Sequence, residues 1–186
     1  MPLTKSTFNI ENVVASASIN QKVDLIEITK KFKHVEYNPK QFPGLVFRIK
    51  SPKTATLIFS SGKMVCTGAK SEALSKKAVK KVVLELRKGG IEIKKNAIII
   101  IQNIVASGNL GGKVHLEEAA RNLDHSMYEP EQFPGLIHRM KEPKTVILLF
   151  ASGKLVCTGA KMEKQVEQAV NNLHKLLEKK ELMIYK

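Results

Sequence analysis

The 186-residue sequence contains no tryptophan and only two cysteines, and aromatic residues make up 5% of it. Two cysteines, Cys66 and Cys157, cannot build a disulfide framework, and we expect both to be small buried apolar residues. The longest apolar run, residues 97–101, is too short to cross a bilayer, and no signal-peptide pattern opens the sequence. We therefore expect a soluble intracellular protein that has no membrane partner.

Acidic residues are also scarce. Seventeen Asp and Glu stand against 31 Lys and Arg, which gives a formal net charge of +14. This excess favours a polyanionic partner, although a solvated basic surface has the same composition. The charge is uneven, with about +11 in residues 1–90 and about +3 in residues 91–186.

The sequence lacks the residue patterns of an enzyme or a metal site. Ser61-Gly62-Lys63 has neither the first glycine nor the Ser/Thr of a phosphate-binding loop. The five histidines show no metal-ligand spacing, and no Ser, His and Asp set or pair of carboxylates clusters. We expect no catalytic activity, no cofactor and no bound metal.

What the sequence does contain is a duplication. The motif QFPGL at residues 41–45 returns at 132–136, and FxSGKxVCTGAK at 59–70 returns at 150–161. One constant offset of about 91 residues aligns both copies. Two copies are too few for a solenoid, so we predict two repeats, residues 1–90 and 91–186, that form either one pseudo-two-fold domain or a tandem pair.

Each repeat has the pattern of an α+β unit. Alternation predicts strands over residues 8–16, 45–50, 54–59 and 63–69, with a further brief strand at Tyr37. A helical period predicts helices over 23–32, 72–87, 114–123 and 163–179. In the helix over 72–87, the expected buried stripe consists of Leu74, Ala78, Val82 and Leu86.

The sheet face that these helices would leave open is apolar. Along the strands, alternation places on this face Val14, Leu57, Phe59, Val65 and Thr67, and Val105, Leu148, Phe150, Val156 and Thr158. A solvated face of an antiparallel sheet is normally polar, so this one indicates an interaction surface, unless another layer packs on it. Basic residues frame it: Arg48, Lys63 and Lys70, and Arg139, Lys154 and Lys161. An apolar floor with a cationic rim suits the minor groove of DNA better than the major groove.

On these duplicated motifs the sequence resembles the TATA-binding protein family in its short archaeal form. The resemblance covers the chain from about residue 8 onward. It implies a saddle, in which one curved ten-stranded antiparallel sheet carries four helices on its convex side. It also implies a non-enzymatic general transcription factor that binds and bends A/T-rich TATA-box DNA and recruits transcription factor B and RNA polymerase. The corresponding location is the cytoplasm, on the archaeal nucleoid, or the nucleus if the source is eukaryotic.

The resemblance also assigns roles to residues. Two pairs of rings would wedge between base steps: Phe42 with Phe59, and Phe133 with Phe150. We expect the Phe150 ring to be exposed in the free protein. The floor would comprise Asn12, Val14, Leu57, Val65 and Thr67, and Asn103, Val105, Leu148, Val156 and Thr158. The six basic rim residues would contact phosphates, and Glu129 and Glu131 would dock transcription factor B.

Other interpretations remain open at this point. A phenylalanine near a strand end often packs in the core, a strand-end asparagine often caps a turn, and surface lysines and loop glutamates are often only solvated. A non-specific architectural or RNA-binding module is the main alternative function, and a DNA glycosylase would need a further catalytic domain. The open face also provides a surface for a homodimer when no DNA is bound.

Overall fold

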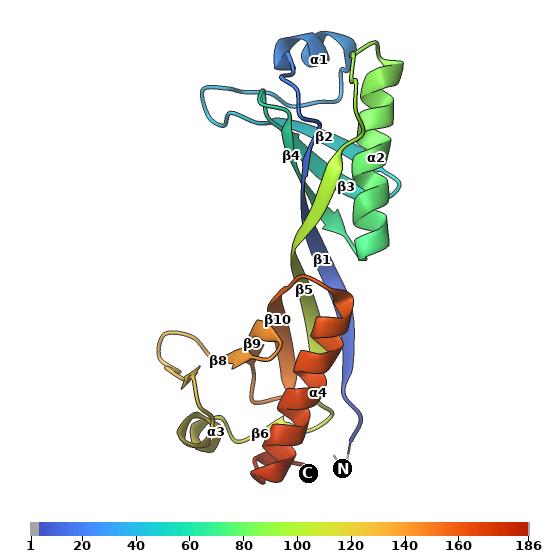
Figure 1. Cartoon of the computed structure of the whole chain (residues 1–186). Coiled ribbons are helices and arrows are strands. Elements are labelled where there is room, and N and C mark those ends of the chain that lie inside the picture. Colours follow the sequence, from blue (N-terminus) through green and yellow to red (C-terminus); the bar gives the residue numbers. More distant parts are fainter. Residues whose placement is uncertain (1–3, 186) are drawn as a thin grey trace. The chain divides into compact units, whose positions relative to one another are not determined.

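The computed structural model describes residues 4–185, over which the chain forms eleven strands and four helices (Figure 1). The first repeat contains β1 (Thr7–Ser18), α1 (Leu25–Lys31), β2 (Leu45–Lys50), β3 (Lys53–Ile58), β4 (Lys63–Ala69) and α2 (Glu72–Lys88). The second contains β5 (Ile98–Asn109), β6 (Lys113–Val114), α3 (Leu116–Asn122), β7 (Ser126–Met127), β8 (Leu136–Lys141), β9 (Lys144–Leu149), β10 (Lys154–Ala160), α4 (Glu163–Lys179) and β11 (Met183–Ile184).

Nine strands form one large antiparallel sheet in the order β2-β3-β4-β1-β5-β10-β9-β8-β7, and β11 and β6 form a small second sheet, counted over residues 4–185. The predicted α+β class is confirmed, with nine strands in the large sheet instead of ten. The strand expected at Tyr37 is reduced to a single bridge between Glu36 and Val46. The equivalent residues of the second repeat, Ser126 and Met127, pair over two residues and form β7.

The contacts divide the chain into two compact units. The first unit is residues 12–102, and the second unit combines the chain up to Glu11 with the chain from Asn103 onward. The long strands β1 and β5 are therefore each shared: residues 7–11 of β1 belong to the second unit, and residues 98–102 of β5 belong to the first.

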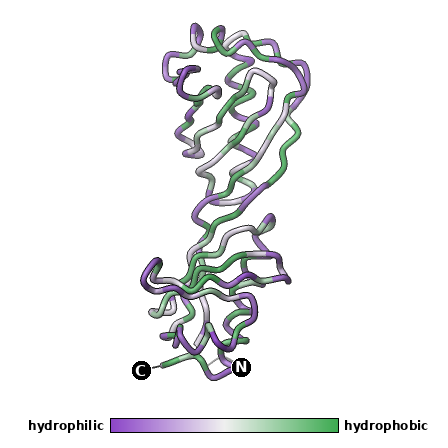
Figure 2. Tube along the Cα trace, turned by 90° about the vertical axis from the view of Figure 1, so that its left-hand side faces the viewer, coloured by the Kyte–Doolittle hydropathy of each residue, from purple (hydrophilic) through white to green (hydrophobic). Residues whose placement is uncertain are grey.

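In the first unit, α1 and α2 pack on one face of the strands. Leu25 and Ile28 of α1 and the buried side of α2 join a core with strand residues such as Phe47, Ile58 and Met64. Figure 1 shows α2 lying along this face of the strands. In the second unit, the buried side of α4 packs in the same way beside β10. Within each unit, Figure 2 shows hydrophobic residues along the strands and polar residues in the connecting loops.

The helix bounds and the buried stripe depart from the sequence prediction in three places. The first helix starts at Leu25 because Asp24 is its N-cap, and the Asp24 carboxylate accepts hydrogen bonds from the backbone N–H groups of Ile26 and Glu27. The third helix starts at Leu116 because residues 113–114 pair with β11. In α2, Leu74 is 37% exposed and Ser75 is buried instead. Each four-residue step overshoots a 3.6-residue turn by about 40°, so the stripe that passes through Ala78 continues to residue 75.

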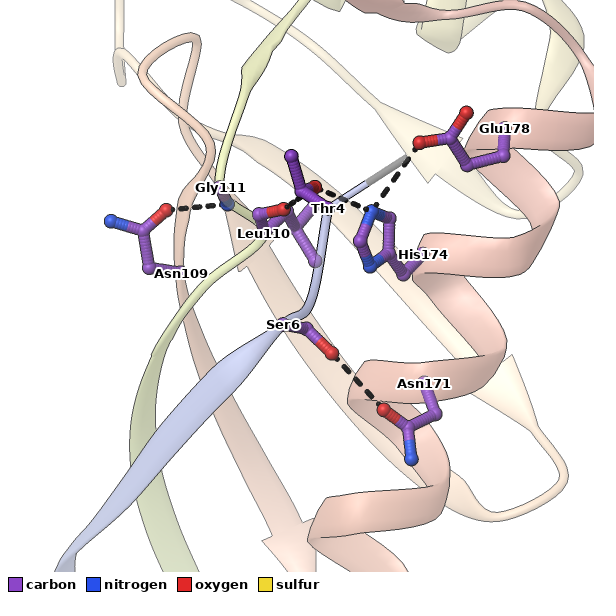
Figure 3. Close-up of polar contacts among 8 residues, drawn as sticks. All are labelled: Thr4, Ser6, Asn109, Leu110, Gly111, Asn171, His174 and Glu178. Carbon is purple, nitrogen blue, oxygen red and sulfur yellow. Dashed lines mark hydrogen bonds and ion pairs between the residues drawn. The ribbon is translucent and has the colours of Figure 1, made fainter. Parts of the chain in front are cut away.

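Within the second unit, the segment that leads into β1 makes polar contacts with residues that follow β5 (Figure 3). The Thr4 hydroxyl donates to the Leu110 carbonyl at 2.6 Å, and the Ser6 hydroxyl donates to the Asn171 side chain at 3.0 Å. His174 on α4 is 2% exposed, and its Nε2 lies 3.4 Å from the Thr4 hydroxyl and 3.5 Å from a Glu178 carboxylate oxygen. Burial lowers the pKa of His174, and the Glu178 carboxylate partly opposes this.

Cys66 and Cys157 are both buried free thiols, as the sequence predicts. Burial raises the pKa of both thiols, that of Cys157 to about 11. Among the residues that the structure describes, no helix is long and apolar enough to span a membrane, and no group of three or more His, Cys, Asp or Glu side chains could hold a metal ion.

Candidate functional site

Each unit has an open face, defined here as the side of its strands opposite the helices. In the first unit Val14, Leu57 and Val65 are partly exposed there, whereas their neighbours Val13, Ile58 and Met64 are buried on the helix side. The second unit repeats this arrangement, with the following residues partly exposed: Val105, Leu148, Phe150, Val156 and Thr158. The assignment of residues to the two faces by alternation is therefore confirmed.

Strand register arranges these residues in rows across the open face. One row joins neighbouring residues of β2, β3, β4 and β1: Val46, Leu57, Val65 and Ser16. The equivalent row of the second unit joins Ile137, Leu148, Val156 and Ser107. Val46 and Ile137 were not predicted as site residues, although each follows a buried leucine in an alternating strand and so had to face the opposite side.

A pair of phenylalanine rings stands at one end of each open face. Phe42 and Phe59 meet edge to face with their centroids 5.9 Å apart, and Phe133 and Phe150 do the same, also at 5.9 Å. The loop rings Phe42 and Phe133 are 43% and 37% exposed. The expectation that Phe150 is exposed was wrong, because its ring is half-buried against Phe133.

The FPG motif has a steric explanation in these pairs. A Cβ on Gly44 would lie 2.6 Å from the Phe42 ring and 3.0 Å from the Phe59 ring. A Cβ on Gly135 would meet the second pair in the same way, 2.7 Å from Phe133. Only glycine lets the chain turn beneath the two rings without displacing them. Each loop is closed by a backbone carbonyl, that of Asn38 or Glu129, which accepts from the N–H of the loop phenylalanine.

The two asparagines each bind the threonine that the sequence placed beside them. Asn12 donates through its Nδ2 to the Thr67 hydroxyl at 2.9 Å, and its Oδ1 accepts from the Gly68 N–H at 2.6 Å. The β1–β4 register shifts at this point, and Gly68 has a φ of +105°, so Asn12 satisfies an N–H that the bulge removes from the ladder. Asn103 makes the equivalent bonds to Thr158 and Gly159, at 3.1 and 2.7 Å. The asparagines therefore stabilise the bulge and orient the threonine hydroxyls on the open face.

The six basic residues of the rim are all exposed: Arg48, Lys63, Lys70, Arg139, Lys154 and Lys161. Arg48 forms an ion pair with Glu36 at 2.8 Å. The counterpart of Glu36 in the second repeat is Met127, so this particular ion pair is absent there. In the first unit Lys50 and Lys53, which were not predicted, join Arg48 around a hollow of about 670 Å³.

Glu129 and Glu131 are exposed in the loop that carries Phe133. The Glu129 backbone carbonyl accepts from the N–H groups of Gln132 and Phe133, which leaves both carboxylates on the loop surface. The equivalent positions of the first repeat are Asn38 and Lys40, so the two loops differ in charge.

The first half of β1 forms a polar edge that was not predicted from the sequence. Thr7 and Asn9 line a hollow of about 620 Å³ in the second unit, together with Phe150 and Val156. In the first unit Ile98 and Ile100 line an equivalent hollow of about 610 Å³. These residues precede the point at which each strand passes from one unit to the other. The signal for this change was two consecutive polar residues, Glu11-Asn12 and Gln102-Asn103, which interrupt the alternation of β1 and β5.

Comparison with known proteins agrees with this architecture. The family described as "Transcription factor TFIID (or TATA-binding protein, TBP)" matches residues 7–89 and again residues 98–180. The chain is 58% identical over 175 residues to the TATA-box-binding protein of Pyrodictium occultum, covering 94% of this chain and 88% of that one. It is 52% identical to the TATA-box-binding protein of Methanobrevibacter smithii, covering 94% of this chain and 98% of that one.

A solved structure, Methanococcus jannaschii TBP, superposes with a TM-score of 0.83 at 44% identity, covering 92% of this chain and 98% of that one. Both repeats, the fold and the sequence identities point to the same family, whose members are transcription factors and not enzymes. The chain belongs to the TATA-binding protein family, as its duplicated motifs predicted.

Proposed function

We propose that this protein binds the minor groove of A/T-rich TATA-box promoter DNA, bends it, and recruits transcription factor B and RNA polymerase to begin transcription. The observation that carries the proposal is the matched pair of open faces, each with an apolar floor, an Asn–Thr pair and a ring pair, in a member of this family. The protein would act in the archaeal cytoplasm, on nucleoid DNA.

The floor favours A·T pairs because its side chains cannot accept a hydrogen bond from the guanine amino group. In the minor groove A·T pairs present only acceptors, whereas a G·C pair adds the guanine amino group as a donor. Leu57 and Val65 of the first unit, and Leu148 and Val156 of the second, have no acceptor for that group. A buried donor without a partner costs roughly 1–3 kcal/mol, so each G·C pair over the floor weakens binding.

The Asn–Thr pairs supply donors at the floor. An amide nitrogen has two N–H groups, and Asn12 uses one of them on the Thr67 hydroxyl. The second N–H can be directed to adenine N3 or thymine O2. The Thr67 hydroxyl donates to Asn12 Oδ1 at 3.3 Å in the free protein, and its hydrogen can turn to the same base acceptors when DNA binds. Asn103 and Thr158 offer the same donors in the second unit.

The ring pairs act as wedges at the outer base steps. Phe42 and Phe133, the more exposed ring of each pair, would insert, and Phe59 and Phe150 would support them from behind. Unstacking a base step costs a few kcal/mol, which the larger contact area of bent DNA offsets. The exposed basic rim would bind phosphates and set the affinity and its dependence on salt, but not the sequence preference.

Glu129 and Glu131 would provide an acidic surface for a basic region of transcription factor B. Their loop is closed by hydrogen bonds to the Glu129 backbone carbonyl, and both side chains are exposed on the loop.

The test is a binding competition at fixed salt between an A/T-rich duplex, a G·C-rich duplex and a double-stranded RNA of equal length. We expect a strong preference for the A/T-rich duplex. We also expect the protein to shorten the end-to-end distance of that duplex, measured by energy transfer between labels at its two ends. Equal binding to all three nucleic acids would contradict the proposal and indicate a non-specific module instead. Replacing Arg139 by Ala should lower the slope of log affinity against log salt by about one without changing the preference for A·T pairs.

A further inference from the structure

The outermost side chains of the two open faces differ in charge. In the first unit the bridge between Glu36 and Val46 places Glu36 on the open face, beside the edge strand β2. In the second unit Met127 pairs with Ile137 in the same way. Glu36 and Met127 are equivalent in the two repeats, and Met127 is 55% exposed. The apolar row of the first unit therefore ends on a carboxylate, and that of the second unit ends on a thioether.

The Glu36 carboxylate forms an ion pair with Arg48, which lies two residues after Val46 in β2 and therefore points to the same face. The Arg48 Nη1 lies 2.8 Å from the Glu36 Oε1, and both side chains are more than half exposed. Arg139 occupies the equivalent position of the second unit, and over residues 4–185 its guanidinium has no acidic partner. The charge of Arg48 is therefore partly neutralised in the free protein, whereas that of Arg139 is not.

The ion pair changes what a phosphate contact at Arg48 costs. A cation that neutralises one phosphate releases about one counterion, so an arginine without an acidic partner adds about one to the slope of log affinity against log salt. Arg139 should behave in this way. Arg48 must first leave Glu36, and the carboxylate left behind near the phosphates attracts a cation from solution. This uptake offsets the release, so Arg48 should add little to the slope.

We propose that Glu36 competes with DNA phosphate for Arg48, so that the first unit makes this phosphate contact only by breaking the ion pair and the second unit makes the stronger one. Glu36 is a positioning residue, because it acts through Arg48. The inference rests on the proposed function and adds a competitor, within the protein, for one of its phosphate contacts. An exposed ion pair is only modestly stable, so Glu36 should lower DNA affinity by roughly threefold.

The experiment compares Arg48→Ala with Arg139→Ala by fluorescence anisotropy on one A/T-rich duplex, over a series of salt concentrations. Arg48→Ala is also measured in a Glu36→Gln background, which removes the carboxylate charge and keeps the size of the side chain. Arg139→Ala is also measured in a Met127→Glu background, which gives the second unit the carboxylate of the first. All four positions are exposed, so the variants should keep wild-type stability, and thermal unfolding checks this.

We expect Glu36→Gln alone to raise the affinity by about threefold, and Met127→Glu alone to lower it by about the same factor. Arg139→Ala should lower the salt slope by about one, and Arg48→Ala by less than about half as much. In the Glu36→Gln background Arg48→Ala should also lower the slope by about one, and in the Met127→Glu background Arg139→Ala should lower it by less than about half as much.

Equal changes of slope for Arg48→Ala with and without the Glu36 carboxylate would overturn the inference, because a carboxylate that only repels DNA leaves the contribution of Arg48 unchanged. The proposed function would still stand in that case. Failure of the wild-type protein to bind the A/T-rich duplex would contradict the proposed function itself.

Discussion

The Oδ1 of Asn12 accepts a hydrogen bond from the backbone N–H of Gly68 at 2.6 Å, and the Nδ2 of the same side chain donates to the Thr67 hydroxyl. One amide therefore stabilises the bulge and also orients a hydroxyl of the open face. The repeat-equivalent amide, Asn103, does the same for Gly159 and Thr158. From the sequence alone, this asparagine had two possible roles: it could bind a backbone group, or it could recognise a ligand. The structure shows that the first role exists and that it leaves an N–H for the second.

The two roles of Asn12 can be separated by substitution. Asn12→Ala removes the acceptor for the Gly68 N–H and also the amide donor on the open face. It should therefore cost about 1 kcal/mol of stability and weaken DNA binding. Asn12→Asp keeps an acceptor for the Gly68 N–H and loses the donor, so it should retain more stability but bind A/T DNA no better than Asn12→Ala. Urea unfolding and fluorescence anisotropy measure the two effects. Wild-type DNA affinity in Asn12→Asp would contradict the donor role.

Replacing Phe150 by Ala should reduce DNA bending, because the ring supports Phe133 in the wedge. The ring is half-buried, so the variant should also lose about 1 kcal/mol of stability. The matched control is Phe32→Leu, which alters a ring pair on the helix side and should affect stability without affecting the bend. Energy transfer between the ends of a labelled duplex gives the bend, and an unchanged angle in Phe150→Ala would count against the wedge.

Charge reversal at Glu129 and Glu131 should spare DNA binding and abolish the ternary complex with transcription factor B. The loop should keep its conformation, because the Glu129 backbone carbonyl closes it and not the side chain. Lys40→Glu in the equivalent loop of the first repeat is the control and should leave the ternary complex intact. A gel-shift assay with added transcription factor B is the measurement, and a supershift that survives in the Glu129→Lys, Glu131→Lys variant would rule out this docking site.

Stability should fall as the solution is acidified, in part through His174. Burial lowers the pKa of His174 below its ordinary value of 6.5. Just below pH 6.5 the unfolded chain therefore binds a proton at this histidine more readily than the native protein does. The contribution of this histidine is therefore present above pH 6.5 and is lost as the pH falls below it. Thermal unfolding at pH 7.5 and pH 5.5 should show a larger loss for the wild type than for His174→Gln. Equal losses in the two proteins would show that His174 does not contribute.

The sequence by itself determined the repeat, the order of the main strands and helices, and which residues of those strands face the helices, but it did not predict the short strands β6 and β11. Alternation is a local property of an extended chain, since neighbouring side chains point to opposite faces whatever the strand pairs with. It placed Val13 and Val14, or Ile58 and Leu57, on opposite faces, and the structure agrees. The resemblance that the duplicated motifs carry likewise implied both ring pairs, which the structure contains.

Only the tertiary structure decided the features that depend on residues distant in the sequence. The half-burial of Phe150 comes from a loop ring seventeen positions earlier in the chain, and the amide of Asn12 is engaged by a bulge in another strand. The hydrogen bonds from Ser107 to Glu11 and from Gln102 to Ser16 likewise depend on β1 and β5 each being shared between the two units. Local periodicity determines which face of the sheet a side chain points to, because it depends only on the extended backbone. Strand pairing and register determine which residues it contacts, because those partners are distant in the sequence.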